Sequence, residues 1–482
     1  MRGELRDRVA SGVAWNMAEK AGSMLLQAVV SLVVLRLLMP EDLGVMAIPT
    51  VFSALALVVV DSGFSQTLIR KDAPTQGDYK SVFLFNIVVS LLLYVLLVAL
   101  APVAARFYDM PVLTRIAPVL FLLLPLNALC VIQNTIFTRQ FRFALISKVV
   151  FISTLAGGLV AVAMALAGCG VWSLVGQRVT AMGTKAALFW ALSDWRPRAP
   201  YDGGALRRMA PYSTRLLVTD LIASGYNNIS QLFVGRMYSA DILAYFNQAQ
   251  KLKELPVTGT VQSVQNVTFP ALAKIAEDGP KFAESYRQMV LVVTFVMFPA
   301  MAGLNAVAHD FFAVFLGAKW MPIVPYFRIA CLGGLFAPVA MISYNVLKVK
   351  SNGSVIVRLE VAKKLVMTGI LALTIPRGPI AIIWGLAAAA LFEMAINFGA
   401  TRRYTLFTTG CFLRTLLPAA AASGLMFGAI LLLERWTAFQ PALALLVKTA
   451  LGAGIYVAVA AALRFEAFGV AVGLMKKFIR RG

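Results

Sequence analysis

Polar side chains recur at regular intervals inside the long apolar segments of this chain, where each must contact another protein group or line a wet space. In the segment 13–38 they are three and four residues apart, which places them on one face of a helix. The segments 210–235 and 240–272 repeat this pattern. The residues of these stripes that are best suited to hydrogen-bond a polar ligand are Asn16, Gln27, Asn227, Asn228, Gln248 and Gln262.

Ten basic and six acidic residues also lie within the apolar segments, and the basic excess favours an anionic ligand such as a phosphate or pyrophosphate group. Bases near the ends of segments, such as Lys185 and Lys448, are expected to extend their ammonium groups toward water. The deeper bases are the predicted substrate-binding anchors, namely Lys20, Arg215, Lys251 and Lys253.

Three acidic residues in the same segments are candidates for coupling or gating: Glu19, Asp61 and Asp220. They could bind a proton or a cation, or they could neutralise the nearby bases. A pair between Glu19 and Arg215, or between Lys20 and Asp220, would make a gate that can break. We expect a swap of the charges at 20 and 220 to restore activity that is lost when either is neutralised.

The polar stripes allow two interpretations. In the first, they are interhelical hydrogen bonds and ion pairs that hold a helical bundle together. In the second, the helices that carry them surround a wet central cavity between two lobes. We favour the second interpretation because the polar segments occupy corresponding positions in the two halves of the chain.

Several kinds of chemistry lack their motifs in this sequence. There is no GxxxxGK[ST], GxSxG or HExxH pattern, so ATP hydrolysis, serine hydrolysis and zinc proteolysis are not expected. The four cysteines are isolated and His309 is the single histidine, which argues against a metal centre. We therefore expect neither an enzyme nor a cofactor.

The composition defines the elements that must position these residues. Of the 482 residues 60% are hydrophobic and 14% are charged, and the mean hydropathy is +0.80. Soluble domains have about 45–50% apolar and about 25% charged residues, so the chain is an all-α polytopic membrane protein. The fourteen predicted spans are 13–38, 43–67, 81–105, 112–136, 144–168, 171–192, 210–235, 240–272, 285–308, 322–347, 355–375, 379–400, 413–433 and 442–463.

The distribution of basic residues predicts the topology. With a cytoplasmic amino terminus, alternate connections hold 27 of the 44 Lys and Arg residues, the opposite connections hold 7, and the spans hold 10. The positive-inside rule then places both termini in the cytoplasm. Most of the net charge of +22 thus reflects topology, and no nucleic acid partner is expected.

A faint internal repeat divides the chain. A shift of 200 residues aligns RLLMPEDLG, residues 36–44, with RMYSADILA, residues 236–244. We predict two pseudo-symmetric six-helix lobes around a central cavity, followed by two further helices. The expected limits are 1–192 for the first lobe, 193–209 for a cytoplasmic connection, 210–400 for the second lobe, 401–463 for the last two spans and 464–482 for a basic cytoplasmic tail.

Several stretches between residues 10 and 350 resemble the Wzx-type polysaccharide transporters, a family of lipid-linked oligosaccharide flippases in the multidrug/oligosaccharidyl-lipid/polysaccharide exporter superfamily. The resemblance is greatest to the exopolysaccharide branch associated with colanic acid. The matching stretches are GVAWNMAEKAGSMLLQAVVSLVVLRLLMPEDLGVMAI, DSGFSQTLIRK, RFYDMP, FTRQFRF, GCGVWSLVGQ, NNISQLFVGRMYSADILAYFNQAQKLKELP, FPALAKI and LGAKWMPIVPYFRI. Asn227 and Asn228 stand where the family often has Asp-Asn, which puts coupling through that position in doubt.

The resemblance implies that the protein flips an undecaprenyl-pyrophosphate-linked oligosaccharide repeat unit from the cytoplasmic to the periplasmic leaflet by alternating access. The product would serve exopolysaccharide or O-antigen and lipopolysaccharide assembly in the bacterial inner membrane. A polysaccharide polymerase and a chain-length regulator are possible partners. Two alternatives stay open: a cation-coupled small-molecule or drug antiporter of the same superfamily, and a membrane polysaccharide polymerase or ligase.

Overall fold

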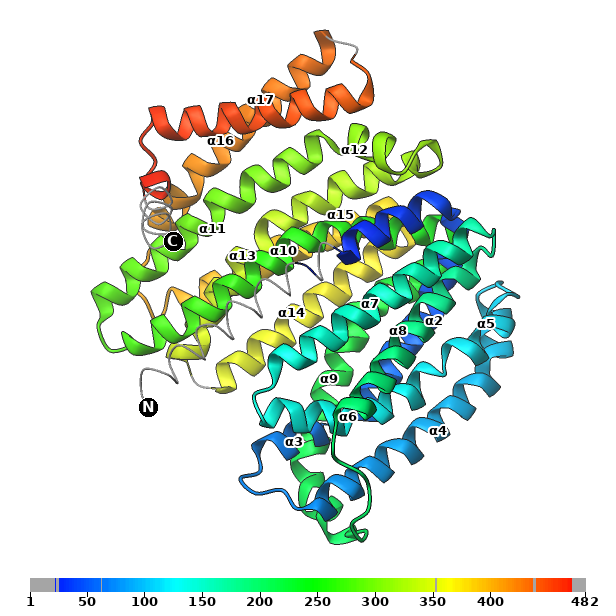
Figure 1. The fold of residues 1–482 in the computed structure, drawn as a ribbon. Helices are drawn as coiled ribbons and strands as arrows, with labels where there is room; N and C mark the ends of the chain where they lie inside the picture. The colour runs from blue at the N-terminus through cyan, green and yellow to red at the C-terminus, as the bar shows by residue number, and fades with distance from the viewer. Residues whose placement is uncertain (1–21, 23–25, 62, 352, 437–438, 470–482) are drawn as a thin grey trace. The chain divides into compact units, whose positions relative to one another are not determined.

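The long runs of leucine, valine, alanine and phenylalanine fold into helices that satisfy their own backbone hydrogen bonds, as a membrane requires. The computed structural model describes residues 22, 26–61, 63–351, 353–436 and 439–469, with the backbone alone in 261–271 and 273–274. These residues contain helices and no strands (Figure 1). The α-helices are α2 (Pro40–Asp61), α3 (Phe64–Arg70), α4 (Gln76–Phe107), α5 (Leu113–Leu120), α6 (Leu123–Arg139), α7 (Phe143–Leu166), α8 (Val171–Leu192), α9 (Gly203–Met237), α10 (Ala240–Lys274), α11 (Gly279–Ala306), α12 (Ala308–Phe315), α13 (Val324–Lys350), α14 (Gly353–Thr374), α15 (Pro379–Thr401), α16 (Thr409–Trp436) and α17 (Pro441–Ala462), and the 3-10 helices are η1 (Ala318–Ile323) and η2 (Ile375–Arg377).

A described helix overlaps each of the fourteen predicted spans. Nine helical segments of the described chain are long and apolar enough to cross a membrane. The helices α8, α9, α10 and α14 have 22 to 35 residues and are less apolar, because they carry charged and amide side chains. A shorter apolar helix, Leu26–Leu37, lies in the first predicted span. The predicted all-α polytopic fold is confirmed.

Helix α4 exposes apolar side chains and buries polar ones, which is the reverse of a helix on the surface of a soluble protein. Its exposed face is apolar, with Leu92 65% and Val95 63% exposed. Its buried face carries Ser81, Asn86 and Ser90, each fully buried. An apolar outer face costs nothing in lipid, whereas polar groups there would be unsatisfied. This distribution is the one expected of a helix that contacts lipid on one side.

The predicted 200-residue repeat has a structural counterpart. The helix before residue 38 ends at Leu37 and the next begins at Pro40, and 200 residues later a helix ends at Met237 and the next begins at Ala240. Both breaks carry the same backbone hydrogen bond. The N–H of Leu38 donates to the carbonyl of the buried Val34 at 2.9 Å, and the N–H of Tyr238 donates to that of the buried Val234 at 3.0 Å. Gly44 lies against the backbone of Ala240, and a Cβ at this glycine would overlap the Ala240 carbonyl.

Packing divides the chain into two compact units, Met1–Ala244 and Tyr245–Gly482. In the first unit α2 packs against α4, α6, α8 and α9, and α7 runs along α8. The unit boundary lies inside α10, so α9 packs with the helices of the first six predicted spans. The predicted lobe limits, with their boundary at 193–209, stay a prediction.

An aromatic cluster organises one end of the first unit. The indole of Trp195 meets the rings of Tyr79 and Phe83 edge-on, with centroids 6.4 and 5.6 Å apart. The connection that follows α8 is thereby fixed against α4. It leads to Asp202, whose backbone N–H donates to Ser81 Oγ at 2.9 Å and whose side chain caps the first turn of α9. This contact fixes where α9 begins.

In the second unit α13 packs tightly against α15 and also against α11. The last two helices, α16 and α17, pack on each other, and α17 also contacts α12. Lys448 of α17 was expected to extend to water, but this expectation is wrong: its side chain is 5% exposed and donates to Asp310 of α12 at 2.6 Å. A carboxylate supplied by a distant segment keeps the ammonium inside.

Candidate functional site

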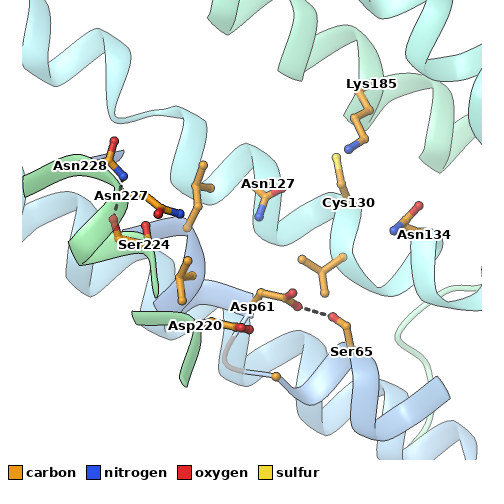
Figure 2. A pocket seen from close by; sticks show the side chains of 14 residues that line it. Asp61, Ser65, Asn127, Cys130, Asn134, Lys185, Asp220, Ser224, Asn227 and Asn228 are labelled. Carbon is orange, nitrogen blue, oxygen red and sulfur yellow. Dashed lines mark hydrogen bonds between the residues drawn. The ribbon is translucent and has the colours of Figure 1, made fainter. Parts of the chain in front are cut away.

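A polar cavity of about 570 Å³ lies inside the first unit. Five helices surround it: α2, α3, α6, α8 and α9 (Figure 2). This volume is within the range of about 300–1,000 Å³ that small-ligand sites occupy. The lining residues are Leu57, Val58, Asp61, Gly63, Ser65, Asn127, Cys130, Val131, Asn134, Lys185, Asp220, Ser224, Asn227 and Asn228.

Two carboxylates from different helices face this cavity. Asp61 is the last residue of α2, and Asp220 lies in the middle of α9. Both carboxylates line the same cavity. The hydroxyl of Ser65 donates to Asp61, as the dashed line in Figure 2 shows. Because like charges repel at short range, a bound cation, a proton or hydroxyl donors would each relieve this pair.

The backbone break after α2 brings Asp61 and Ser65 together. Gly63 has φ 68°, a left-handed conformation that costs other residues about 1–2 kcal/mol. A Cβ at Gly63 would also lie 2.9 Å from Cβ of Leu216 and from the Ser213 carbonyl of α9. The glycine therefore permits both the turn into α3 and the close approach of α9, which carries Asp220.

Four asparagine amides supply most of the remaining polarity. Asn127 and Asn134 lie on α6, and Asn227 and Asn228 lie on α9. The Nδ2 group of Asn228 donates to the Ser224 carbonyl at 2.8 Å. An amide both donates and accepts hydrogen bonds, as a sugar hydroxyl does. The cavity can therefore hold a ligand that is rich in hydroxyl groups.

The single base of the cavity stands apart from the carboxylates. Lys185 of α8 points toward Cys130 in Figure 2, and its ammonium lies 5.6 Å from the centre of the Phe189 ring. The lining thus carries two carboxylates and one ammonium. The basic excess of the spans is therefore not concentrated in this cavity. Among the described residues no group of three or more metal-ligating side chains occurs.

The predicted site residues are distributed unevenly around this cavity. Asp61, Asp220, Asn227 and Asn228 line it. Other predicted residues lie elsewhere in the fold: Gln27 and Arg215 are exposed in the first unit, and Gln248, Lys251 and Lys253 belong to the second. Asn16, Glu19 and Lys20 lie outside the described residues, as does the side chain of Gln262.

One of the predicted anchors in the second unit has a defined local contact. The ammonium of Lys253 donates to Gln250 Oε1 at 2.9 Å, one turn earlier in α10. The stem of Lys253 lies 3.3 Å from the Cβ position of Gly334 on α13. The gate pairs that involve Glu19 and Lys20 lie outside the described residues.

Several lining residues escaped the sequence prediction of the site. Lys185 was assigned to a helix end, and Asn127, Cys130 and Asn134 were not singled out. The spacing of these three residues is three and four, so they form a stripe of the kind already recognised in other segments. Ser65 and Ser224 also line the cavity and were not proposed as ligands.

The fold and the polar cavity define a helical membrane protein with a polar site among its spans. Residues 33–325 match the polysaccharide biosynthesis protein family, and the chain belongs to that family. It is similar to the teichuronic acid biosynthesis protein TuaB of Bacillus subtilis, with 27% identity over 58% of each chain. It is also similar to the succinoglycan biosynthesis transport protein ExoT of Rhizobium meliloti, with 23% identity over 93% of this chain and 92% of ExoT.

The chain is likewise 24% identical to the lipopolysaccharide biosynthesis protein WzxC of Escherichia coli over 74% of this chain and 73% of WzxC. Among solved structures, the fold resembles the lipid II flippase MurJ, with a TM-score of 0.72, 14% identity and coverage of 93% of this chain and 98% of MurJ. It also resembles an inward-facing multidrug transporter of the MATE family, with a TM-score of 0.59, 13% identity and coverage of 79% and 95%. The resemblance to Wzx-type transporters is confirmed.

Proposed function

We propose that this protein flips a polyprenyl-pyrophosphate-linked oligosaccharide from the cytoplasmic to the periplasmic leaflet of a bacterial inner membrane by alternating access. The observation that carries the proposal is the polar cavity of the first unit, in a chain with nine described helical segments that are long and apolar enough to cross a membrane. A hydrophilic sugar crosses a bilayer only when water or polar protein groups replace its hydration. The lipid tail needs no such cavity.

The side chains of the cavity suit the sugar part of such a cargo better than its pyrophosphate. Carboxylates accept hydrogen bonds from sugar hydroxyls, and the amides of Asn127, Asn134, Asn227 and Asn228 both donate and accept them. With two carboxylates and one ammonium, the lining would repel a free pyrophosphate. We therefore assign the sugar to this cavity and the pyrophosphate to bases elsewhere.

The bases proposed to hold the pyrophosphate are Lys20, Arg215, Lys251 and Lys253. Lys253 is the most defined of them, because its ammonium donates to the side-chain amide of Gln250. Glu19, Asp61 and Asp220 are proposed to act in gating or coupling. Both termini are proposed to be cytoplasmic, on the basis of the 27 basic residues on that side.

A second candidate is a cation-coupled antiporter for small molecules or drugs. The net acidic lining favours it, because two neighbouring carboxylates attract a cationic substrate. The two functions differ in what a cell lacks when the protein fails. A flippase defect stops surface polysaccharide and leaves its lipid-linked precursor on the inner leaflet, whereas an antiporter defect changes sensitivity to cationic compounds.

The experiment replaces cavity residues in a strain that depends on this chain for surface polysaccharide. Asp61→Asn, Asp220→Asn and Lys185→Met each keep the side-chain size close to the original and remove one charge from the lining. The controls, Asp194→Asn and Lys148→Met, remove the same charges from exposed positions outside the lining. We expect the cavity variants to reduce export at least about tenfold, since a lost charged hydrogen bond is worth about 1.5–3 kcal/mol.

Export and precursor are measured together at equal protein amounts. Lipid-linked repeat units that accumulate on the inner leaflet in the cavity variants, with normal export in the controls, support the flippase. Normal export in all three cavity variants would remove this cavity from the transport path. Normal export with altered resistance to cationic compounds would instead support the antiporter.

A further inference from the structure

Two of the stretches that resemble the polysaccharide transporters meet at one side chain in the first unit. The first stretch, 61–71, contains α3, and the second, 137–143, contains the end of α6. Arg139 is the last residue of α6, and its guanidinium lies at the end of α3. The cavity uses only the beginning of the first stretch, so its end and the whole second stretch have another role.

Arg139 donates to four backbone carbonyls at the end of α3 and just past it. Its Nη1 group donates to the carbonyls of Leu68 at 2.7 Å, Ile69 at 2.9 Å and Lys71 at 2.6 Å, and its Nη2 group donates to that of Asp72 at 3.0 Å. The last carbonyls of a helix have no partner within the helix. A cation there also interacts favourably with the helix dipole. One side chain thus binds two carbonyls of the last turn of α3 and two of the residues that follow it.

The helix α3 depends on such external contacts, because seven residues are too few for a helix to be stable alone. A second set of contacts holds it to α9. The hydroxyls of Thr67 and Ser213 are 2.8 Å apart, and the guanidinium of Arg70 lies 4.9 Å from the centre of the Tyr212 ring. Arg139 and α9 therefore hold α3 from two sides.

The position of α3 matters for the cavity because α3 carries Ser65. The Ser65 hydroxyl donates to Asp61, and both residues line the cavity together with Gly63. If the end of α3 moved, the helix would pivot at the Gly63 turn and withdraw the hydroxyl from the carboxylate. The four bonds of Arg139 are thus connected to the Asp61 carboxylate through a short rigid helix.

The second unit contains a similar contact between a base and a backbone carbonyl at the corresponding place. Lys350 is the last residue of α13, and its ammonium donates to the carbonyl of Ala276, just past the end of α10. The same ammonium lies 4.7 Å from the centre of the Phe282 ring. In the first half of the chain the base ends α6 and contacts the carbonyls after α3. In the second half the base ends α13 and contacts a carbonyl after α10. A contact that occurs in both halves is a feature of the fold and not an accident of one loop.

We propose that Arg139 is a positioning residue for transport: it fixes α3 so that Ser65 holds the Asp61 carboxylate in its place in the cavity. Arg139 itself touches no cargo. The effect on transport rests on the proposed function, whereas the effect on α3 does not. Lysine could replace the charge but not the four bonds, because its three donors radiate from one atom while the guanidinium spreads its donors across a plane.

The test compares Arg139→Ala and Arg139→Lys with Arg142→Ala. Arg142 is a matched control, because it is an exposed arginine of the same connection whose guanidinium lies over the Phe137 ring. The first measurement is amide hydrogen exchange of residues 64–72 in the purified protein without any cargo. We expect exchange to be about tenfold faster in Arg139→Ala, partly so in Arg139→Lys, and unchanged in Arg142→Ala.

The second measurement is a rescue. The pair Thr67→Cys and Ser213→Cys would join α3 to α9 by a disulfide where the two hydroxyls now meet. It is introduced after Cys169 and Cys411 are replaced by serine, while the buried Cys130 and Cys331 are kept. In Arg139→Ala the disulfide should restore slow exchange and polysaccharide export together, and its reduction should abolish both.

Three results would overturn the proposal. Unchanged exchange in Arg139→Ala would show that the four bonds do not hold α3. Fast exchange with normal export would show that the position of α3 is irrelevant to transport. Restored protection without restored export would show that Arg139 acts by another route. If the cargo assignment fails, the exchange and cross-linking results still stand, so the two failures are distinguishable.

Discussion

Replacing Lys448, the single charged residue of α17, by methionine should destabilise the second unit. The ammonium is 5% exposed and lies 2.6 Å from Asp310, whose side chain is 8% exposed. Methionine has similar length and fills the same space. The substitution would leave the Asp310 carboxylate buried without its ammonium, which costs about 3–5 kcal/mol in buried pairs of this kind.

The converse substitution, Asp310→Asn, should cost roughly half as much as the loss of Lys448. A second carboxylate, that of Glu434, lies 3.3 Å from the Lys448 ammonium and is 41% exposed. It partly neutralises the lysine after Asp310 is gone. The double variant with both substitutions contains no buried charge, so its stability should return to within about 1 kcal/mol of the original protein.

The assay is unfolding in detergent micelles by titration with dodecyl sulfate, followed by tryptophan fluorescence for all four proteins of this cycle. The difference between the double variant and the two single variants gives the coupling energy of Lys448 and Asp310 directly. A loss below about 0.5 kcal/mol for Lys448→Met would mean that the ammonium extends to water, as its place near a helix end suggested, and would refute the buried pair.

Two further changes test the helices around the cavity. Gly63→Ala should destabilise the first unit by more than about 1–2 kcal/mol, because the left-handed backbone is unfavourable for alanine and its Cβ would press on the Ser213 carbonyl; unchanged stability would contradict the tight turn. Asp202→Ala should speed amide exchange of residues 203–208 at neutral pH, since Asp202 caps α9. The hydrogen bond from Arg208 lowers the pKa of Asp202 below its usual value of 3.8, so this protection is present above that value and disappears as the pH falls through the lowered pKa; a difference that persists in stronger acid would contradict it.

The spans could be predicted because lipid imposes length and hydrophobicity on every crossing segment. The segment 240–272 illustrates this point, since its amide and charged residues left open an amphipathic surface helix, yet α10 is one continuous helix of 35 residues. The helix break before Pro40 could be predicted from the internal repeat, because it aligns with the break before Ala240.

Four of the fourteen residues that line the cavity could be predicted as site residues, and the others show which information a sequence lacks. Asp61, Asp220, Asn227 and Asn228 were found because charges and adjacent amides stand out in an apolar segment. Lys185 was missed because its position near a helix end suggested that it extends to water. That position does not reveal which other helices surround its side chain. Long-range partners are similarly invisible to periodicity, because they depend on which helices the fold brings into contact.

The Lys448 pair shows the same limit most clearly. Its partner Asp310 is 138 residues away in the sequence, on a short helix that no hydropathy pattern associates with α17. The four carbonyl contacts of Arg139 were equally beyond prediction, since backbone acceptors are identical at every residue. Only the packed structure determines which of them a side chain can reach.

The central claim concerns the movement of a lipid-linked sugar, and flipping in proteoliposomes tests it most directly. The purified chain is reconstituted into vesicles that contain an undecaprenyl-pyrophosphate-linked oligosaccharide in both leaflets, and an impermeant glycosidase is added outside. We predict that nearly all of the oligosaccharide is cleaved with the active protein, whereas protein-free vesicles and vesicles with Asp61→Asn keep about the inner half intact. An inner half that survives equally with the active protein and without it would contradict the account.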